Sequence, residues 1–257
     1  HNYWHHTANN WDWDNPSRWM GQIAGDCVDL NTENDYVADY LVKCYGQFIK
    51  MGVDGFRIDT SGHISRLTFN KEFIPQFKAL GEKYKAKRLN NAPFFMYGEV
   101  CTRANDVTYR GQQNLSCYFY TWKSDESLLK DWNGSQSYWD SQVLPEGAEP
   151  VGPQQLCLKE TTSPKSNNAK MLNGAWHEPD LSQNSGFNVI DFPMHYSYNT
   201  AEQAFRLASG DECYNDATYN VVYVDSHDYS PGPNDANRFG GTDAQWAENL
   251  SLLFTFR

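Results

Sequence analysis

The hydrophobic positions between residues 32 and 52 recur with a helical period. Apolar side chains three and four residues apart form a single stripe, made up of Val37, Leu41, Cys44, Tyr45 and Phe48. Thr32 and Asp35 have the spacing of a capping box that uses Asp in place of Glu. Gly52 follows the stripe, and glycine commonly ends helices because it adopts left-handed backbone conformations. The pattern therefore predicts a helix that begins after Asn31 and ends at Gly52.

A strand, a second helix and a second strand follow. The short apolar runs at residues 53–59 and 94–99 indicate buried strands. Between them, helical spacing relates Phe73, Ile74, Phe77, Leu80 and Tyr84. This order predicts a right-handed parallel β/α unit, in which active residues lie at the carboxyl ends of the strands. Asp59 and Glu99 occupy those ends.

The second half of the chain is less regular. Ser, Asn, Gln, Pro and Gly dominate residues 115–186. We interpret this stretch as an insertion or a small subdomain, because a structureless loop of that length is unusual in a compact domain. Strand-like runs return at Phe187–Met194 and Tyr219–Asp228, with a predicted helix around residues 201–207 between them. A last helix is predicted from Asp243.

The candidate chemistry starts from Asp59. Side chains two residues apart on a strand point to the same face, so Arg57 and Asp59 share a face. A guanidinium beside a carboxylate favours the ionised form that a nucleophilic Asp requires, although a structural ion pair has the same pattern. Glu99 follows the apolar stretch Phe94–Tyr97, which is expected to raise its pKa and keep its proton. An ordinary Glu at a strand end is the alternative.

Four stretches resemble motifs of the α-amylase superfamily, glycoside hydrolase family 13, in the family's order. They are C-V-D-L-N at 27–31, which resembles the motif closing the family's inserted domain B, and three strand motifs: G-V-D-G-F-R-I-D-T-S-G-H at 52–63, F-F-M-Y-G-E-V at 94–100 and Y-N-V-V-Y-V-D-S-H-D at 219–228. The resemblance covers nearly the whole chain. It implies an α/β fold that is part of a (β/α)8 TIM barrel, from the end of domain B and the fourth strand through the helix after the seventh.

The resemblance also implies a role for each matching residue. A retaining glycosidase needs one carboxylate that attacks the anomeric carbon and one carboxylic acid that protonates the departing oxygen. Asp59 would be the nucleophile, Glu99 the acid/base and Asp228 the residue that holds the distorted sugar near the transition state. Contacts with the substrate or the nucleophile are implied for Arg57, His227 and His63.

A structural calcium ion is implied in the same way. Asp29 would bind it through the carboxylate and His63 through the backbone carbonyl, which are the hard oxygen ligands that calcium prefers. The site would be incomplete here, because the family's third-strand motif supplies a further Asn ligand and is absent from this sequence.

Two positions depart from the family pattern. Gly62 stands where many α-amylases have Lys, and Ser226 stands where an Asn is common. Both positions line or adjoin the substrate site, so linkage and product specificity remain open.

Composition and charge narrow the class of partner. The formal net charge of -11 and a pI near 5.0 disfavour nucleic acid, whose phosphates require basic patches. Aromatic residues make up 15 %, and their flat rings suit the faces of sugars. No apolar run approaches the roughly 20 residues needed to span a bilayer. Large cores also use aromatic residues, so composition leaves both uses open. The family resemblance implies an α-glucan polysaccharide or oligosaccharide as the partner, and the charge disfavours nucleic acid.

Residues 1–26 alternate Asn, Asp and Trp densely and are predicted to form an irregular loop. Solvent exposure rather than metal binding is expected for His1, His5 and His6. Either sugar stacking or packing of the loop itself is expected for Trp4, Trp11, Trp13 and Trp19. The six cysteines form no C-x-x-C pair, which argues against a zinc ribbon and leaves disulfides and buried thiols both open: Cys27, Cys44, Cys101, Cys117, Cys157 and Cys213.

The predicted organisation has two parts. Residues 1–31 form the end of the loop-rich domain B, and residues 32–257 form a partial barrel with the insertion at 115–186. The first three strands and the eighth strand of the family's barrel would lie outside this chain, so its required partner is the rest of its own catalytic domain. Residues 1–257 alone are expected to be inactive. An extracellular or cell-surface location is expected, although no signal peptide is visible.

The expected function is retaining hydrolysis of α-1,4-glucosidic bonds in starch-like polysaccharides through a covalent glycosyl-enzyme. A transglycosylase or an α-1,6-acting enzyme of the same family shares the carboxylates and stays an alternative. A non-catalytic binding relative is disfavoured because Asp59, Glu99 and Asp228 are all present.

Overall fold

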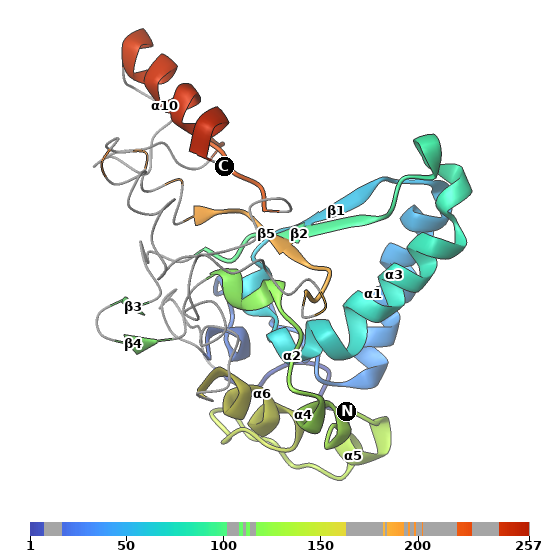
Figure 1. Ribbon diagram of the computed structural model, residues 1–257. Coiled ribbons are helices and arrows are strands. Elements are labelled where there is room, and N and C mark those ends of the chain that lie inside the picture. The colour runs from blue at the N-terminus through green and yellow to red at the C-terminus, as the bar shows by residue number, and fades with distance from the viewer. Residues whose placement is uncertain are drawn as a thin grey trace.

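A small parallel sheet with helices packed beside it forms the centre of the protein (Figure 1). The computed structural model describes residues 1–7, 17–101, 108–109, 112–113, 117–162, 182, 184–192, 195, 198, 202, 220–227 and 242–256. Asp228 and most of the helix predicted around residues 201–207 lie outside the described residues.

Three parallel strands make up the central sheet, in the order β1 (Gly55–Ile58), β2 (Phe95–Gly98) and β5 (Asn188–Val189). A separate antiparallel pair is formed by β3 (Thr108–Tyr109) and β4 (Gln112–Gln113). The parallel β/α order expected from the sequence is confirmed. Each strand is shorter than its apolar run. The described part of the run at 219–228, residues 220–227, contributes one parallel bridge, between Val221 and Ile190.

The register of β1 and β2 decides where the candidate carboxylates lie. Ile58 pairs with Gly98 at the last position of both strands. The residues that follow, Asp59 and Glu99, therefore leave the sheet side by side at its carboxyl edge.

Helix α1 spans Asp35–Met51 and begins later than the sequence predicted. Its N-cap is Asn34, whose side-chain oxygen accepts a hydrogen bond of 2.9 Å from the amide of Tyr36. The capping box proposed for Thr32 and Asp35 is therefore wrong. Asn is among the strongest N-cap residues because its side chain satisfies an amide that has no partner within the helix.

The buried face of α1 also differs from the predicted stripe. It consists of Val37, Ala38, Val42, Gly46 and Ile49. The exposed side includes Cys44, Tyr45 and Phe48. Small residues let the helices approach closely, since a Cβ at Gly46 would lie 2.8 Å from Leu80 Cδ1 on α3 (Ile74–Lys83). The helix ends as predicted at Gly52, whose φ of 104° is left-handed.

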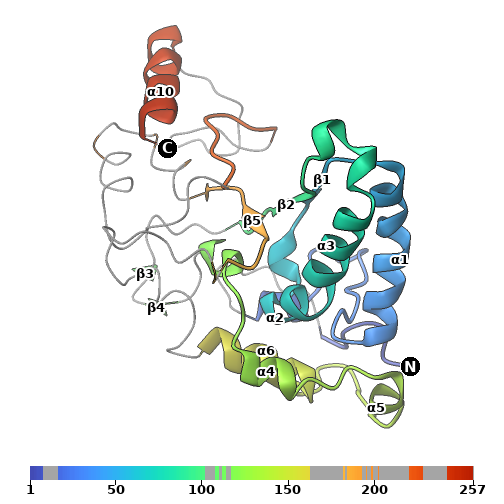
Figure 2. The same cartoon turned by 45° about the vertical axis from the view of Figure 1, so that its right-hand side comes forward.

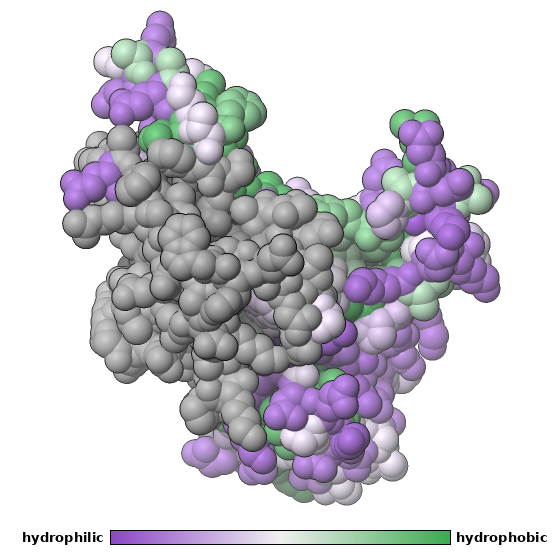
Figure 3. Space-filling model, viewed as in Figure 1, coloured by the Kyte–Doolittle hydropathy of each residue, from purple (hydrophilic) through white to green (hydrophobic). Residues whose placement is uncertain are grey.

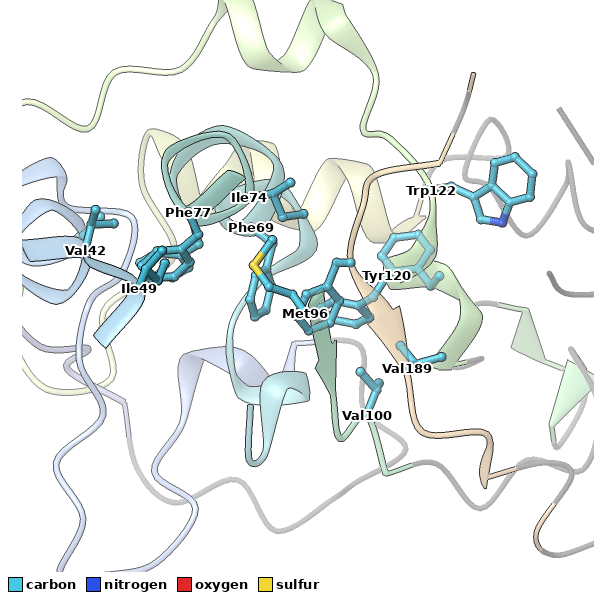
Figure 4. Close-up of a cluster of buried hydrophobic side chains, with 14 of the residues drawn as sticks. Val42, Ile49, Phe69, Ile74, Phe77, Met96, Val100, Tyr120, Trp122 and Val189 are labelled. Atoms are coloured by element: carbon cyan, nitrogen blue, oxygen red, sulfur yellow. The ribbon is translucent and has the colours of Figure 1, made fainter. Parts of the chain in front are cut away.

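The main hydrophobic core lies between these helices and the sheet (Figure 4). Its buried side chains include Ile49 of α1, Ile74 and Phe77 of α3, Met96 of β2 and Val189 of β5. Phe56 on β1 packs edge-on to Phe77 and Phe94, with ring centroids 5.4 Å and 5.0 Å apart. Fully burying one such side chain contributes about 1.5–3 kcal/mol. This packing holds β1 against β2 and fixes the positions of their ends.

The described part of the predicted insertion contains three helices, α4 (Glu126–Lys130), α5 (Gln136–Asp140) and α6 (Pro153–Thr162). Glu160 of α6 forms a buried ion pair of 2.7 Å with Arg66, in the short helix α2 (Arg66–Thr68) next to β1. This part therefore packs against the β/α unit, and the predicted division into domains stays a prediction.

A second apolar cluster joins the N-terminal segment to these helices. Its buried members are Trp19, Met20, Leu67, Leu128 and Cys157. Trp19 is 1 % exposed, so it packs the loop and is not placed for sugar contact, whereas Trp4 is 46 % exposed. Trp11 and Trp13 lie outside the described residues.

The described residues of the N-terminal segment, 1–7 and 17–26, are mostly irregular, as predicted, but they are held by specific contacts. Trp4 forms an antiparallel bridge with Leu30, and the imidazole of buried His5 lies 2.6 Å from both Asp29 Oδ2 and Glu33 Oε2. Solvent exposure was the wrong expectation for His5. Burial lowers the pKa of His5, but the charges and hydrogen bonds of Glu33 and Asp29 outweigh burial and raise it to about 10.

Hydrophilic side chains dominate the right-hand side of the surface in Figure 3, over α1 and α3. Helix α10 (Asp243–Phe256), which begins as predicted, lies on the other side of the sheet (Figure 2). Among the described residues, no helix is long and apolar enough to cross a membrane. No disulfide joins the described cysteines Cys27, Cys44, Cys101 and Cys157.

Candidate active site

The chain turns sharply immediately after Asp59. Thr60 has φ 42° and ψ 39°, a left-handed conformation that is unusual for a β-branched residue. A 3₁₀ turn follows at Ser61–His63, closed by a hydrogen bond of 2.8 Å from the His63 amide to the Thr60 carbonyl. Such strain costs about 1–3 kcal/mol and accumulates at functional sites. The turn leaves Asp59 at the edge of the sheet.

The backbone of Glu99 is tied to both sides of Asp59. The Glu99 amide donates to the Ile58 carbonyl at 2.9 Å, and the Gly62 amide donates to the Glu99 carbonyl at 3.4 Å. Gly98 is required for this close approach, because a Cβ there would lie 2.3 Å from Ser61 Oγ and 2.4 Å from Phe187 Cζ. The two carboxylates are therefore held together by main-chain contacts as well as by the strand register.

One guanidinium bridges both carboxylates. Arg57 Nη1 lies 3.1 Å from Asp59 Oδ1, and Arg57 Nη2 donates to Glu99 Oε2 at 2.6 Å. The sequence predicted the contact with Asp59 and did not predict the contact with Glu99. The side chain of Asp59 is 73 % exposed and that of Glu99 is 9 % exposed, so the two carboxylates lie in very different environments.

These environments shift the pKa of Glu99 upward. Burial raises the pKa of Glu99, Arg57 opposes that rise through its charge, and a hydrogen bond and the charge of Asp59 add to it. The raised pKa expected from the apolar stretch before Glu99 is therefore confirmed. Two neighbouring carboxyl groups in contrasting environments are the arrangement from which acid and nucleophile roles can be assigned.

The other candidate residues are placed less completely. His227 is exposed and ends the described segment 220–227, which lies next to β5 through the bridge of Val221. His63 is partly buried, and burial together with the charge of Arg18 lowers its pKa to about 4. His63 is therefore a neutral imidazole at neutral pH. The roles of Arg57, His63 and His227 in binding substrate stay predictions, as do the catalytic roles.

One of the predicted calcium ligands, Asp29, already interacts with a histidine. Asp29 Oδ2 is taken up by His5 Nδ1 at 2.6 Å, so a calcium ion at Asp29 would have to use the other carboxylate oxygen or displace His5. Within the described part of the chain, no group of three or more His, Cys, Asp or Glu side chains is arranged to hold a metal ion. Calcium stays a prediction.

The sequence interpretation missed the contacts that two residues, Arg18 and His5, make in this region. Arg18 donates to the carbonyls of Gly62 and Cys101, which follow the two candidate catalytic residues. One signal could have drawn attention to it, because Arg18 is the only Lys or Arg before Lys43. His5 has no such signal, since its partners come from a distant stretch.

Comparisons with known proteins found the following similarities. Residues 2–122 match the family model described as the alpha amylase catalytic domain. An alpha-amylase from Streptomyces lividans is 36% identical over 98 residues, which are 36% of this chain and 10% of that protein. The crystal structure of an alpha-amylase from Geobacillus thermoleovorans complexed with acarbose matches 42% of this chain and 22% of its own, with 24% identity and a TM-score of 0.33.

Replacement of Arg57 tests the electrostatics of the pair without any assay of function. Arg57→Met removes the positive charge that stabilises the Glu99 carboxylate, so the pKa of Glu99 should rise further. Arg57→Lys keeps the charge and should cause a smaller rise. Carbon-13 NMR titration of labelled Glu99 carboxyl measures both. An unchanged or lowered pKa in Arg57→Met would show that the bridge is not the controlling contact.

Proposed function

We propose that this chain, whose residues 2–122 match the alpha amylase catalytic domain, is part of a glycoside hydrolase family 13 enzyme and carries the nucleophile and the acid/base of a retaining α-glucan hydrolase. The substrate is an α-1,4-linked, starch-like glucan. Family membership implies a (β/α)8 barrel, to which the three parallel strands and their helices would belong.

The observation that carries the proposal is the shared guanidinium between an exposed Asp59 and a buried Glu99. Retaining glycosidases keep their two carboxyl groups about 5–5.5 Å apart, whereas inverting enzymes separate them by about 6.5–9.5 Å to admit a water molecule. One guanidinium within reach of both carboxylates favours the short separation.

Each residue then has a defined role in the two steps of the reaction. The Asp59 carboxylate attacks the anomeric carbon while the Glu99 carboxylic acid donates its proton to the departing glycosidic oxygen, which leaves a glycosyl ester on Asp59. Glu99, now a carboxylate, removes a proton from the incoming water, and that water releases the sugar with net retention. Arg57 orients both carboxylates, and Asp228, His227 and His63 hold the sugar.

Two further parts of the proposal rest on the family resemblance. A structural calcium ion would be held by the carboxylate of Asp29 and the main-chain oxygen of His63, and would fix the N-terminal segment to the turn after β1. An extracellular or cell-surface location would bring the enzyme to polymeric substrate.

Substitutions of the pair separate the two roles. In the full-length protein, Asp59→Asn should abolish turnover of every substrate, because no nucleophile remains. Glu99→Gln should lower kcat on starch by about 10²–10⁴-fold and lower turnover of α-glucosyl fluoride less, because fluoride leaves with little protonation although release of the sugar from Asp59 still needs the base. Steady-state kinetics on both substrates measure this. Asp54→Asn, at the exposed opposite end of β1, is the control and should leave both rates unchanged.

Equal losses on starch and fluoride in Glu99→Gln would remove Glu99 from the acid role. Turnover by Asp59→Asn at the wild-type rate would end the nucleophile assignment.

Calcium binding is tested by stability. Added calcium should raise the unfolding temperature of the full-length protein after chelator treatment, because a ligand that binds only the folded state stabilises it. The same addition should have little effect on Asp29→Asn. Equal increases in both proteins would place the ion elsewhere, and no increase in either would remove calcium from the proposal.

A further inference from the structure

Arg18 is a buried cation that reaches both candidate catalytic loops. It begins the short 3₁₀ helix Arg18–Met20 and is 4 % exposed. Its Nε donates to the Gly62 carbonyl at 3.1 Å, and its Nη1 donates to the Cys101 carbonyl at 2.6 Å. Hydrogen bonds from a charged donor are stronger than neutral ones, and the planar guanidinium fixes the direction of both.

The two acceptors are not arbitrary carbonyls. Gly62 lies three residues after Asp59, and Cys101 lies two residues after Glu99. One guanidinium therefore joins the segments that follow both carboxylates. Arg57 holds the carboxylates themselves, whereas Arg18 holds the backbone from which they project.

Gly62 has no side chain and therefore leaves room for the Arg18 guanidinium. We call this guanidinium, with its hydrogen bonds to Gly62 and Cys101, the brace. A Cβ at position 62 would lie 1.8 Å from Arg18 Nη2, 2.5 Å from Cζ and 2.6 Å from Nε. No side chain at position 62 can coexist with the guanidinium in this place, so the two positions depend on each other.

We propose that Arg18 is a positioning residue for the Asp59–Glu99 pair and that Gly62 is glycine because Arg18 occupies the space of its side chain. The inference rests on the proposed function for its kinetic consequence, but its structural consequence is independent of any activity. Loss of the brace lets the two loops shift relative to each other, and a misplacement of about 1 Å can lower a catalytic rate about 10²-fold.

Four variants of the full-length protein test the proposal: Arg18→Ala, Arg18→Lys, Gly62→Ala and the double variant Arg18→Ala/Gly62→Ala. Arg88→Ala is the matched control. Arg88 is also 4 % exposed and also bridges two carbonyls, of Gly81 at 2.6 Å and Ala92 at 2.7 Å, but it lies before β2 at the opposite end of the strands.

The expected kinetic result is a loss of about 10²-fold in kcat on starch, with KM within twofold, in both Arg18→Ala and Gly62→Ala. Arg18→Lys should recover part of the rate, because an ammonium can still donate to one carbonyl. The double variant should lose no more than either single variant, since the two changes remove the same brace. Arg88→Ala should lower the unfolding temperature and leave kcat unchanged.

A second readout does not need activity. The pKa of the Glu99 carboxyl, followed by carbon-13 NMR, should change in Arg18→Ala and Gly62→Ala and stay at the wild-type value in Arg88→Ala. If the wild-type protein does not cleave starch, the proposed function fails and this readout alone decides the role of Arg18.

The proposal is overturned if Arg18→Ala loses stability as Arg88→Ala does while kcat and the pKa of Glu99 stay at wild-type values. Additive losses in the double variant would also overturn it. Should Arg18→Ala fail to fold, Arg18→Lys and Gly62→Ala carry the same test.

Discussion

The contact on which the site depends is the guanidinium of Arg57 held between Asp59 and Glu99. It requires that the ends of β1 and β2 lie at the same height, which the pairing of Ile58 with Gly98 provides. In addition, the Asp59 carboxylate is exposed to solvent and the Glu99 carboxylate is buried. Glycosidic chemistry by two carboxylates needs this asymmetry, because an ionised nucleophile and a protonated acid have to coexist at one pH.

The packing and the backbone geometry around Asp59 and Glu99 limit how far the two carboxylates can move. The core between α1, α3 and the sheet holds the strands, and Gly98 lets the turn after Asp59 approach β2. The strained backbone of Thr60 directs the chain into that turn. Arg18 then joins the two segments that follow Asp59 and Glu99 through hydrogen bonds to the carbonyls of Gly62 and Cys101.

The order of elements and the carboxyl-edge position of Asp59 and Glu99 could be predicted from the sequence, because they follow from local periodicity and the geometry of parallel strands. The direction of the pKa shift of Glu99 could be predicted too, because burial raises the pKa of a carboxyl group. The buried face of α1 could not be predicted from the sequence. It includes Ala38 and Gly46, whose burial depends on packing against α3 rather than on their own hydrophobicity. His5 and Arg18 were missed for a similar reason, as their partners lie between 24 and 83 residues away along the chain.

The central claim is that Asp59 forms a covalent bond with the sugar while Glu99 handles the proton. The most direct measurement is mass spectrometry of the full-length protein after reaction with 5-fluoro-α-glucosyl fluoride, a substrate designed to form the glycosyl-enzyme faster than it is hydrolysed. The account predicts one added fluoroglucosyl group on the peptide that contains Asp59, with no label in Asp59→Asn. A label on Glu99, or starch cleavage that releases the β-anomer first with no adduct, would contradict it.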